Sequence, residues 1–197
     1  MLMSRPFMVE FSGTPEAGKT TTINAVADML RKNDYKTIIL KESAESLPSE
    51  IPKGTFDANM WMHFITQSGL ISALYSKADI VLIDRGIIDS EFYGQKFLND
   101  GLCTKAKYDE FKKMFLQHLK PNLFIALMVT PEESVKRRGG KGRLVNKEYI
   151  QNYNEAYLKF FETIIVNKHL IMTDNIELYE VCKTVLNIIL KNLPWMN

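Results

Sequence analysis

The stretch FSGTPEAGKTTT, residues 11–22, decides the fold of this chain. Its two glycines lie five residues apart, and a lysine and three threonines follow the second glycine. The spacing Gly-x-x-x-x-Gly-Lys-Thr is typical of a phosphate-binding loop, in which successive backbone N–H groups turn inward around an anion. We therefore expect nucleotide phosphates to be bound by Gly13, Thr14, Pro15, Glu16, Ala17, Gly18, Lys19, Thr20 and Thr21.

Two side chains of this loop have chemistry of their own. We expect Lys19 to reach the β- and γ-phosphoryl oxygens of ATP as a mobile positive charge. The hydroxyl of Thr20 is expected to occupy one position on a bound Mg²⁺ ion. ATP and Mg²⁺ are therefore the predicted cofactors.

The sequence on both sides suits such a loop. PFMVEF, residues 6–11, predicts a short buried strand that enters the loop. Between residues 19 and 33, apolar side chains recur at helical spacing, namely Ile23, Val26, Ala27 and Leu30. A helix that begins directly after the loop points its N-terminus, with its partial positive charge, at the phosphates.

Length and composition limit the classes of protein to consider. We expect a single domain, residues 1–197, that buries about 70% of its unfolded surface. A net charge of +2 with dispersed basic residues argues against a nucleic acid polymer as partner. The two cysteines lie far apart, which fits a reducing compartment, and no long apolar run predicts a membrane span. The prediction is a cytoplasmic protein that acts on a small molecule and is compatible with a homodimer.

Apolar runs alternate with amphipathic segments along the rest of the chain. Further strands are predicted in KTIIL, DIVLID, NLFIALMV and LIMT, at residues 36–40, 79–84, 122–129 and 170–173. The predicted helices include residues 57–77, 91–98, 107–119 and 146–166, and a last helix is opened by Asp174 with Glu177 at capping-box spacing. The predicted fold is therefore α/β, a three-layer P-loop NTPase fold with a five-stranded parallel sheet and helices on both faces.

Charged residues stand where predicted strands end, which is where ligands bind in such sheets. Asp84 closes DIVLID, and we expect its carboxylate to reach the Mg²⁺ shell. Arg85 is expected to hold an anionic group or to pair with a carboxylate such as Glu42. Glu42 follows the second strand and is the candidate for taking a proton from an accepting hydroxyl. A salt bridge at the strand end is the alternative for Asp84 and Arg85.

KRRGGKGR, residues 136–143, places five cations and three glycines between two predicted helices. Glycines supply hinges, and arginines brought over a γ-phosphoryl group neutralise charge as it transfers. We predict a lid at residues 136–146 with Arg138 and Arg143 as its catalytic arginines, although the sequence does not separate Arg137 from Arg138. A solvated surface loop is the alternative. The role of Glu16, an acid inside the phosphate loop, stays open.

The helix predicted at residues 57–77 has polar side chains on an apolar stripe. Phe64 is a candidate for stacking on a nucleobase of the substrate, and Gln67 is a candidate for hydrogen bonding to it. A partly exposed helix produces the same pattern. His63 is expected to be a surface or structural residue, and the aromatic residues between 149 and 161 are expected to pack in the core.

Together these segments resemble the thymidylate kinase and deoxynucleoside kinase group of P-loop kinases over nearly the whole chain. The matching landmarks, in the order of that group, are FMVEFSGTPEAGKTTT, ILKES, WMHFITQSGL, LIDRGIIDSEFYGQ and PEESVKRRGGKGRLVNKEYIQNYNEAYLKF. The resemblance implies a kinase that transfers the γ-phosphoryl group of ATP to a nucleoside monophosphate or a (deoxy)nucleoside. It implies an acceptor's 5′ end near Asp84 and Arg85, a base at Glu42, a stacking ring at Phe64, and lid arginines at Arg138 and Arg143.

The chain departs from both branches of this group. Pro15 occupies the third position of the loop, where thymidylate kinases usually carry an acid, and Gln67 lies where they carry a phosphate-binding Arg. Gly86 lies where nucleoside kinases usually carry Ser. The acceptor is therefore left open. Two alternatives are a regulatory nucleotide-binding P-loop NTPase, which the missing Asp-x-x-Gly disfavours, and a P-loop kinase for another small hydroxylated metabolite.

Overall fold

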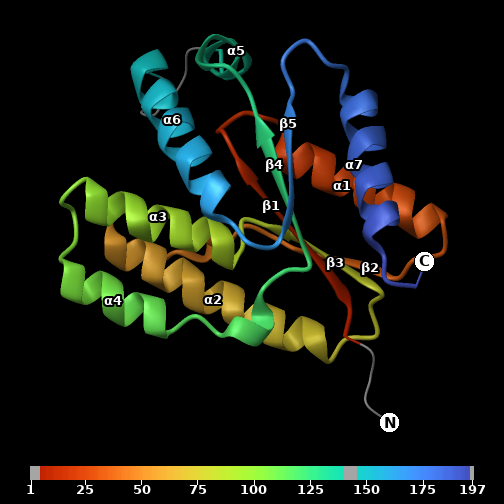
Figure 1. Cartoon of the computed structure of the whole chain (residues 1–197), viewed down its shortest axis with the longest axis horizontal. Helices are drawn as coiled ribbons and strands as arrows, with labels where there is room; N and C mark the ends of the chain where they lie inside the picture. Colours follow the sequence, from red (N-terminus) through yellow and green to blue (C-terminus); the bar gives the residue numbers. More distant parts are fainter. Residues whose placement is uncertain (1–4, 140–145, 196–197) are drawn as a thin grey trace.

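The computed structural model describes residues 5–139 and 146–195. A five-stranded sheet with the strand order β2-β3-β1-β4-β5 forms its centre (Figure 1), and all neighbouring strands are parallel. The strands are β1 (Phe7–Gly13), β2 (Thr37–Leu40), β3 (Ile80–Asp84), β4 (Leu123–Met128) and β5 (Asn167–Met172). The predicted α/β class with a five-stranded parallel sheet is confirmed.

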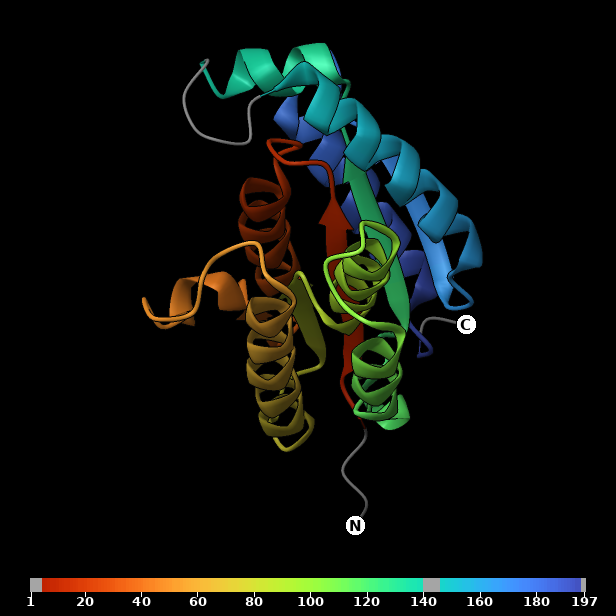
Figure 2. The same ribbon diagram turned by 90° about the vertical axis from the view of Figure 1, so that its left-hand side faces the viewer.

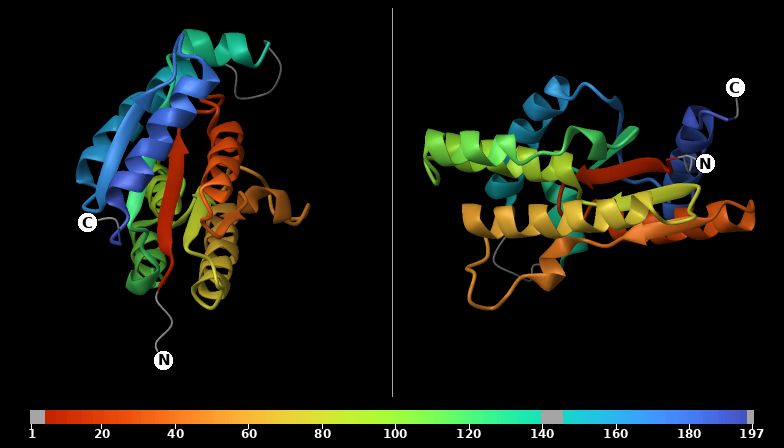
Figure 3. Two further views of the ribbon diagram at one scale, coloured as in Figure 1. Left: turned by 90° about the vertical axis from the view of Figure 1, so that its right-hand side faces the viewer. Right: turned by 90° about the horizontal axis from the view of Figure 1, so that it is seen from below.

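Helices cover both faces of the sheet (Figures 2 and 3). One face packs against α1 (Lys19–Lys32) and α7 (Leu178–Asn192). The other face packs against α2 (Phe56–Leu74), α3 (Ile87–Asn99) and α6 (Lys147–Thr163), and α4 (Lys105–Lys113) packs against α3. A short helix, α5 (Pro131–Arg137), lies beyond the carboxyl end of β4 and contacts α6 (Figure 1).

Side chains of the central strand β1 alternate between the two faces, as the period of a strand requires. Val9 and Phe11 belong to the core formed with α1 and α7. Met8 belongs to the core on the opposite face, and Glu10 and Ser12 share its side of the strand. All seven residues of β1 are buried, so the carboxyl group of Glu10 must find polar partners inside the protein.

The predicted capping box of the last helix is wrong. α7 begins at Leu178, and its N-cap residue is Glu177, which makes no side-chain capping bond. The carboxylate of Asp174 instead accepts hydrogen bonds from the backbone N of Thr130 (3.0 Å) and from its Oγ1 (2.5 Å). A tertiary contact with the end of β4 therefore takes the side chain that local spacing assigned to the helix.

Two other helices differ most from their predicted bounds. α3 begins at Ile87, several residues before the predicted start at 91. The helix predicted over residues 107–119 ends at Lys113, and a 3₁₀ turn, Gln117–Leu119, follows it. Phe115 and Leu119 turn into the core, which accounts for this break. Within residues 5–139 and 146–195, no helix is long and apolar enough to cross a membrane.

His63 lies in the core between α2 and α4. Its side chain is completely buried, and its ring centroid is 4.3 Å from that of Phe115 and 5.0 Å from that of Phe111. Burial lowers the pKa of His63 to about 4, although an interaction with the backbone of Met114 opposes this change. The histidine is therefore neutral at neutral pH and acts as a packed aromatic ring.

We expect the protein to lose stability as the pH falls from about 6.5 towards 4, because the unfolded chain then binds a proton that the folded His63 does not. The loss should be about 3 kcal/mol if the full change in pKa is expressed. Urea unfolding at pH 7 and pH 4.5 should show this loss in the wild type and in His118→Gln, which removes an exposed histidine. His63→Phe should show a smaller loss, and the same loss in this variant would contradict the assignment.

Candidate active site

The turn from β1 into α1 depends on two glycines. Gly13 has a φ of +123°, and a Cβ atom at this position would lie 2.0 Å from the carbonyl oxygen of Leu127 in β4. Gly18 has a φ of +84° and is the N-cap residue of α1. Both positions therefore need the left-handed backbone or the close approach that glycine allows. The loop between them is confined against β4, where the backbone N of Thr14 donates to Leu127 O at 3.1 Å.

Helix α6 anchors the start of this loop. The hydroxyl of Thr14 donates to Asn154 Oδ1 at 2.7 Å, and the amide nitrogen of Asn154 donates to Val129 O at 2.9 Å. The hydroxyl of Tyr153 donates to the carbonyl of Gly13 at 3.1 Å. These bonds fix the backbone at the start of the loop. Pro15 has no N–H group, so the third loop position offers no backbone donor.

Lys19 begins α1 and folds back over the loop. Its Nζ donates to the carbonyl of Thr14 at 2.7 Å and to that of Gly13 at 3.2 Å, and only 7% of the residue is exposed. Burial, with a smaller contribution from Arg85, lowers the pKa of Lys19 to about 7. The ammonium group is therefore held at the loop but is poorly solvated, which favours an anionic partner.

Thr20, in the first turn of α1, meets Asp84 at the carboxyl end of β3. Phe11 of β1 pairs with Asp84 of β3, and the hydroxyl of Thr20 donates to Asp84 Oδ2 at 2.6 Å. Asp84 is 3% exposed, and its Oδ1 has no hydrogen-bond partner among the residues that the structure describes. A hydroxyl beside a buried carboxylate with one unpaired oxygen is a donor set that suits Mg²⁺.

Arg85 is the centre of a group of charged side chains. Its backbone is left-handed, with a φ of +59°, and its N–H donates to Phe11 O at 2.9 Å. Its Nε lies 3.1 Å from Glu42 Oε1, and its Nη1 lies 3.6 Å from Asp89 Oδ2. Burial raises the pKa of Glu42, and the Arg85 guanidinium opposes that rise. One cation thus links the carboxylate of Glu42, beyond the end of β2, to that of Asp89 in the first turn of α3.

One cavity of about 560 Å³ is lined by most of these groups, namely Lys19, Thr20, Glu42, Arg85 and Asp89. The phosphate loop forms one wall, the segment that starts at Glu42 forms another, and α2 and α3 form the far wall. The far wall contributes apolar and polar side chains, namely Ala58, Asn59, Met62 and Thr66 from α2 and Asp89, Ser90, Tyr93 and Phe97 from α3. The cavity therefore joins the predicted phosphate site to a pocket with aromatic and amide groups.

The two predicted base contacts lie away from this cavity. Phe64 is 47% exposed, on the side of α2 that also exposes Trp61 and Ile65. Gln67 is buried, but its Oε1 accepts the backbone N–H of Leu116 at 3.1 Å. Neither residue lines the cavity, which argues against both as acceptor contacts. Because α2 carries apolar side chains on more than one face, hydrophobic spacing did not indicate which face turns inward.

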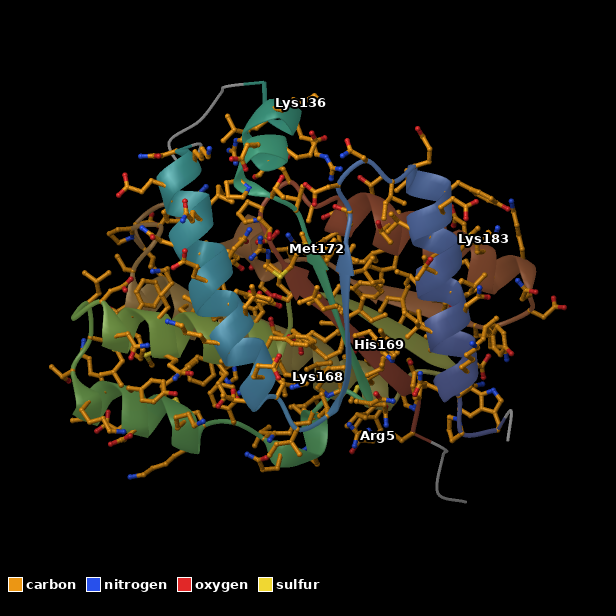
Figure 4. The ribbon with its side chains drawn as sticks, turned by 45° about the horizontal axis from the view of Figure 1, so that its top comes forward. Arg5, Lys136, Lys168, His169, Met172 and Lys183 are labelled. Atoms are coloured by element: carbon orange, nitrogen blue, oxygen red, sulfur yellow. The ribbon has the colours of Figure 1, made fainter. Side chains whose placement is uncertain are left out.

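The structure separates the two neighbouring arginines at the start of the predicted lid. Arg137 donates to Thr173 O at 2.7 Å and to Thr173 Oγ1 at 3.1 Å, which fastens α5 to the end of β5. Arg138 lines the cavity, and its Nη1 lies 3.3 Å from Glu16 Oε1. Figure 4 shows Lys136, where the predicted lid begins, on α5. Arg143 and most of the predicted lid lie outside the described residues.

Sequence reasoning missed Asp89 and Tyr93. Both follow Arg85 at intervals of four residues, so a helix starting near residue 87 brings them to one face. The expected helix started at residue 91, which hid this pattern. Glu10 was also missed, and a single charged residue inside the apolar run FMVEF was the signal that could have revealed it.

Comparisons with known proteins agree with this geometry, although no family model matches the chain. The thymidylate kinase of Caldanaerobacter subterraneus subsp. tengcongensis is 26% identical over 168 residues, which cover 77% of this chain and 79% of that protein. The thymidylate kinase of Thermoanaerobacter sp. strain X514 is 25% identical over 203 residues, which cover 94% of this chain and 98% of that protein. The chain is a kinase, and it is similar to thymidylate kinases over most of its length.

The fold of the kinase is also that of a solved structure. The deoxyadenosine kinase from M. mycoides, solved with the products dCMP and a flexible dCDP, matches it with a TM-score of 0.70 at 18% identity. The match covers 93% of this chain and 98% of that one. The predicted P-loop fold is therefore confirmed over nearly the whole kinase.

Proposed function

We propose that the kinase transfers the γ-phosphoryl group of ATP to a nucleoside or nucleoside monophosphate, with Mg²⁺ held by Thr20 and Asp84. Kinases of this group use ATP and Mg²⁺ in general. The observation that carries the proposal is the 2.6 Å contact between Thr20 and Asp84. It lies where the cavity brings Lys19 together with the ion pair of Arg85 and Glu42.

The phosphate side of the reaction depends on charge neutralisation. Lys19 and the N-terminus of α1 supply positive charge to the phosphate oxygens, which carry the charge of the transition state. Thr20 and Asp84 supply the hydroxyl and carboxylate oxygens that hold Mg²⁺. When bound, the ion neutralises charge on the transferring group and orients it.

The acceptor side depends on Glu42 and Arg85. In the proposed step, the carboxylate of Glu42 takes the proton of the acceptor hydroxyl as the hydroxyl oxygen bonds to the γ-phosphorus. The bond between that phosphorus and the bridging oxygen breaks, and ADP leaves. The raised pKa of Glu42 makes it a better proton acceptor than an ordinary carboxylate. Arg85 holds Glu42 in place through their 3.1 Å ion pair.

The charges beside the acceptor site favour an uncharged hydroxyl over a phosphate as acceptor. The guanidinium of Arg85 already faces Glu42 at 3.1 Å and Asp89 at 3.6 Å. A monophosphate brought to this position would meet two carboxylates as well as one cation, and like charges at such distances repel. A nucleoside hydroxyl meets no such repulsion, and Tyr93 and Phe97 offer ring faces for its base.

An ADP-release assay tests the proposal. The protein is incubated with Mg·ATP and with paired acceptors, each a deoxynucleoside and its 5′-monophosphate, and the phosphorylated product is identified by mass spectrometry. We expect acceptor-dependent ADP release, with nucleosides giving higher kcat/KM than their monophosphates. ATP binding without an acceptor-dependent increase for any of them would contradict the kinase assignment. Higher kcat/KM for the monophosphates would contradict only the preference for a hydroxyl.

Arg137, the last residue of α5, and Arg138, its C-cap residue, should respond differently to substitution. We expect Arg138→Ala to lower kcat by roughly 10²-fold with little change in thermal stability, because its charge faces the cavity. Arg137→Ala should lower stability by about 1–3 kcal/mol, with a smaller effect on kcat, because it leaves the carbonyl of Thr173 without this donor. Thermal unfolding and steady-state kinetics on both variants check this. The reverse pattern would exchange the two roles.

A further inference from the structure

Glu10 is a buried carboxyl group in the middle of the central strand. None of its surface is exposed. Its Oε1 accepts the backbone N–H of Asp89 at 2.8 Å, and its Oε2 accepts that of Ile88 at 3.2 Å. Burial raises the pKa of Glu10 to about 8, and the backbone hydrogen bonds oppose that rise. Burying this group is costly, so its contacts with α3 require an explanation.

The two amides belong to the first turn of α3. That helix begins at Ile87, so Ile88 and Asp89 are its second and third residues, and Gly86 is its N-cap residue. The second and third amides are the donors that a Ser, Thr, Asp or Asn at the N-cap position normally satisfies. Gly86 has no side chain to do so. Glu10 supplies the missing acceptors from a strand that is distant in the sequence.

The carboxyl group of Glu10 occupies the space that a side chain at position 86 would need. A Cβ atom on Gly86 would lie 2.4 Å from Glu10 Oε2 and 2.5 Å from its Cδ. Any side chain at position 86 would therefore collide with the carboxyl group that replaces the local cap. The helix start accommodates either a side chain at position 86 or the carboxyl of Glu10, but not both.

The first turn of α3 also carries a charged residue of the cavity. The Asp89 carboxylate accepts a hydrogen bond from Ser12 Oγ and lies 3.6 Å from Arg85 Nη1. Arg85 in turn lies 3.1 Å from Glu42. Glu10 accepts the backbone N–H of Asp89 itself. A shift of the helix start would therefore move the Asp89 carboxylate and disturb its ion pair with Arg85.

We propose that Glu10 is a positioning residue that caps α3 from the central strand and so places Asp89 and Arg85 at the acceptor side of the cavity. This inference rests on the proposed function, because it assigns the acceptor side to these charges. It predicts that the loss of Glu10 weakens the use of the acceptor more than the use of ATP. Lys19 and Thr20 belong to α1 and remain in place when α3 shifts.

The first test compares Glu10→Ala with Val9→Ala. Val9 is the neighbouring residue of β1, is equally buried, and faces α1 and α7 instead of α3, so its truncation destabilises the same strand without touching the cap. We expect Glu10→Ala to lower kcat/KM for the acceptor by roughly 10- to 100-fold, because two buried donors lose their acceptors. The KM for ATP should change less than twofold. Val9→Ala should leave both values within twofold of the wild type.

The second test moves the cap back to its usual place. Gly86→Ser alone should lower kcat/KM for the acceptor, because its Cβ collides with Glu10. Combined with Glu10→Ala, the serine has room, and its hydroxyl can accept the N–H groups of Ile88 and Asp89. We expect the double variant to recover to within roughly threefold of the wild type. Additive losses in the double variant would overturn the proposal.

Amide hydrogen exchange tests the capping role of Glu10 without relying on catalytic activity. In full-length protein, exchange at Ile88 and Asp89 should speed up in Glu10→Ala, stay slow in Val9→Ala, and slow again in the double variant. If Glu10→Ala fails to fold, Glu10→Gln is used, since it keeps one acceptor oxygen, and an intermediate increase in exchange and in acceptor KM is expected. Unchanged exchange at both amides would overturn the proposal.

Failure of the proposed function is distinguishable from failure of this inference. If the wild type shows no acceptor-dependent ADP release, the kinase assignment fails, and the exchange data alone decide whether Glu10 is the cap. If the wild type is active and Glu10→Ala has the same acceptor KM and kcat as Val9→Ala, the positioning role is overturned while the kinase stands.

Discussion

Lys19→Ala should lower kcat by about 10³-fold, because it removes a preorganised positive charge from the phosphate oxygens in a poorly solvated site. The fold should survive this substitution. Lys19 donates to two loop carbonyls, and one of them, that of Gly13, also accepts the hydroxyl of Tyr153. Steady-state kinetics with Mg·ATP and the best acceptor measure the effect, and thermal unfolding measures the stability.

Lys32→Ala is the matched control for this substitution. Lys32 ends the same helix, is exposed, and lies in the last turn of α1, far from the loop. We expect its turnover to equal that of the wild type. Near wild-type turnover in Lys19→Ala would remove the phosphate loop from the mechanism. A large loss in both variants would indicate damage to α1 instead of loss of one charge.

Asp84→Asn is expected to have the next largest effect, with kcat lowered by about 10²-fold and the Mg²⁺ concentration for half-maximal rate raised. The amide keeps the size of the side chain but removes the charge that favours the metal ion. Asp84 is buried, and its Oδ1 is unpaired among the described residues, so removing the charge should leave the melting temperature unchanged or raise it. Lower activity with equal or higher stability is the pattern of a functional residue.

Asp79→Asn provides the comparison. Asp79 lies just before the other end of β3, where its carboxylate accepts the backbone N–H of Lys36 at 2.8 Å. We expect this variant to keep the wild-type dependence on Mg²⁺ concentration. If Asp84→Asn also kept that dependence, Asp84 would be a structural residue at a strand end, and the metal site would have to be sought elsewhere.

The part of the candidate site that faces ATP could be predicted because its residues are contiguous in the sequence. The strand, the glycine loop and the first helix follow one another within residues 7–32, and their spacing decides their geometry. The alternation of apolar strands and amphipathic helices likewise predicted the parallel sheet. A parallel sheet then brings Asp84 beside Thr20, since strand ends of the same direction share one edge.

The part of the cavity that faces the phosphate acceptor was predicted less well, because its walls come from two separate helices, α2 and α3. The spacing within α2 indicated Phe64 and Gln67. The residues of α2 that line the cavity are instead Ala58, Asn59, Met62 and Thr66. The apolar character of α2 extends around the helix, so its own sequence contains no clear inner face. Packing against α3 decides that face.

Predictions based on neighbouring residues also failed where a group distant in the sequence competed for the same hydrogen bond. Asp174 has the spacing of a helix cap but binds Thr130 instead. Glu10 does the opposite, since it interrupts an apolar strand and caps a helix that begins long after it. Local propensity is a weak preference, and a well-formed tertiary hydrogen bond in a buried setting outweighs it.

The amino-acid order was enough to predict the glycine loop, the parallel sheet and the edge that carries the candidate site, because each follows from spacing over a few neighbouring residues. The inner face of α2, the separate roles of Arg137 and Arg138, and the pairing of Glu10 with Gly86 became apparent after folding. They depend on which surfaces of distant segments pack together. The burial and hydrogen bonding of the whole chain decide which surfaces pack together, so this packing cannot be predicted from any single segment.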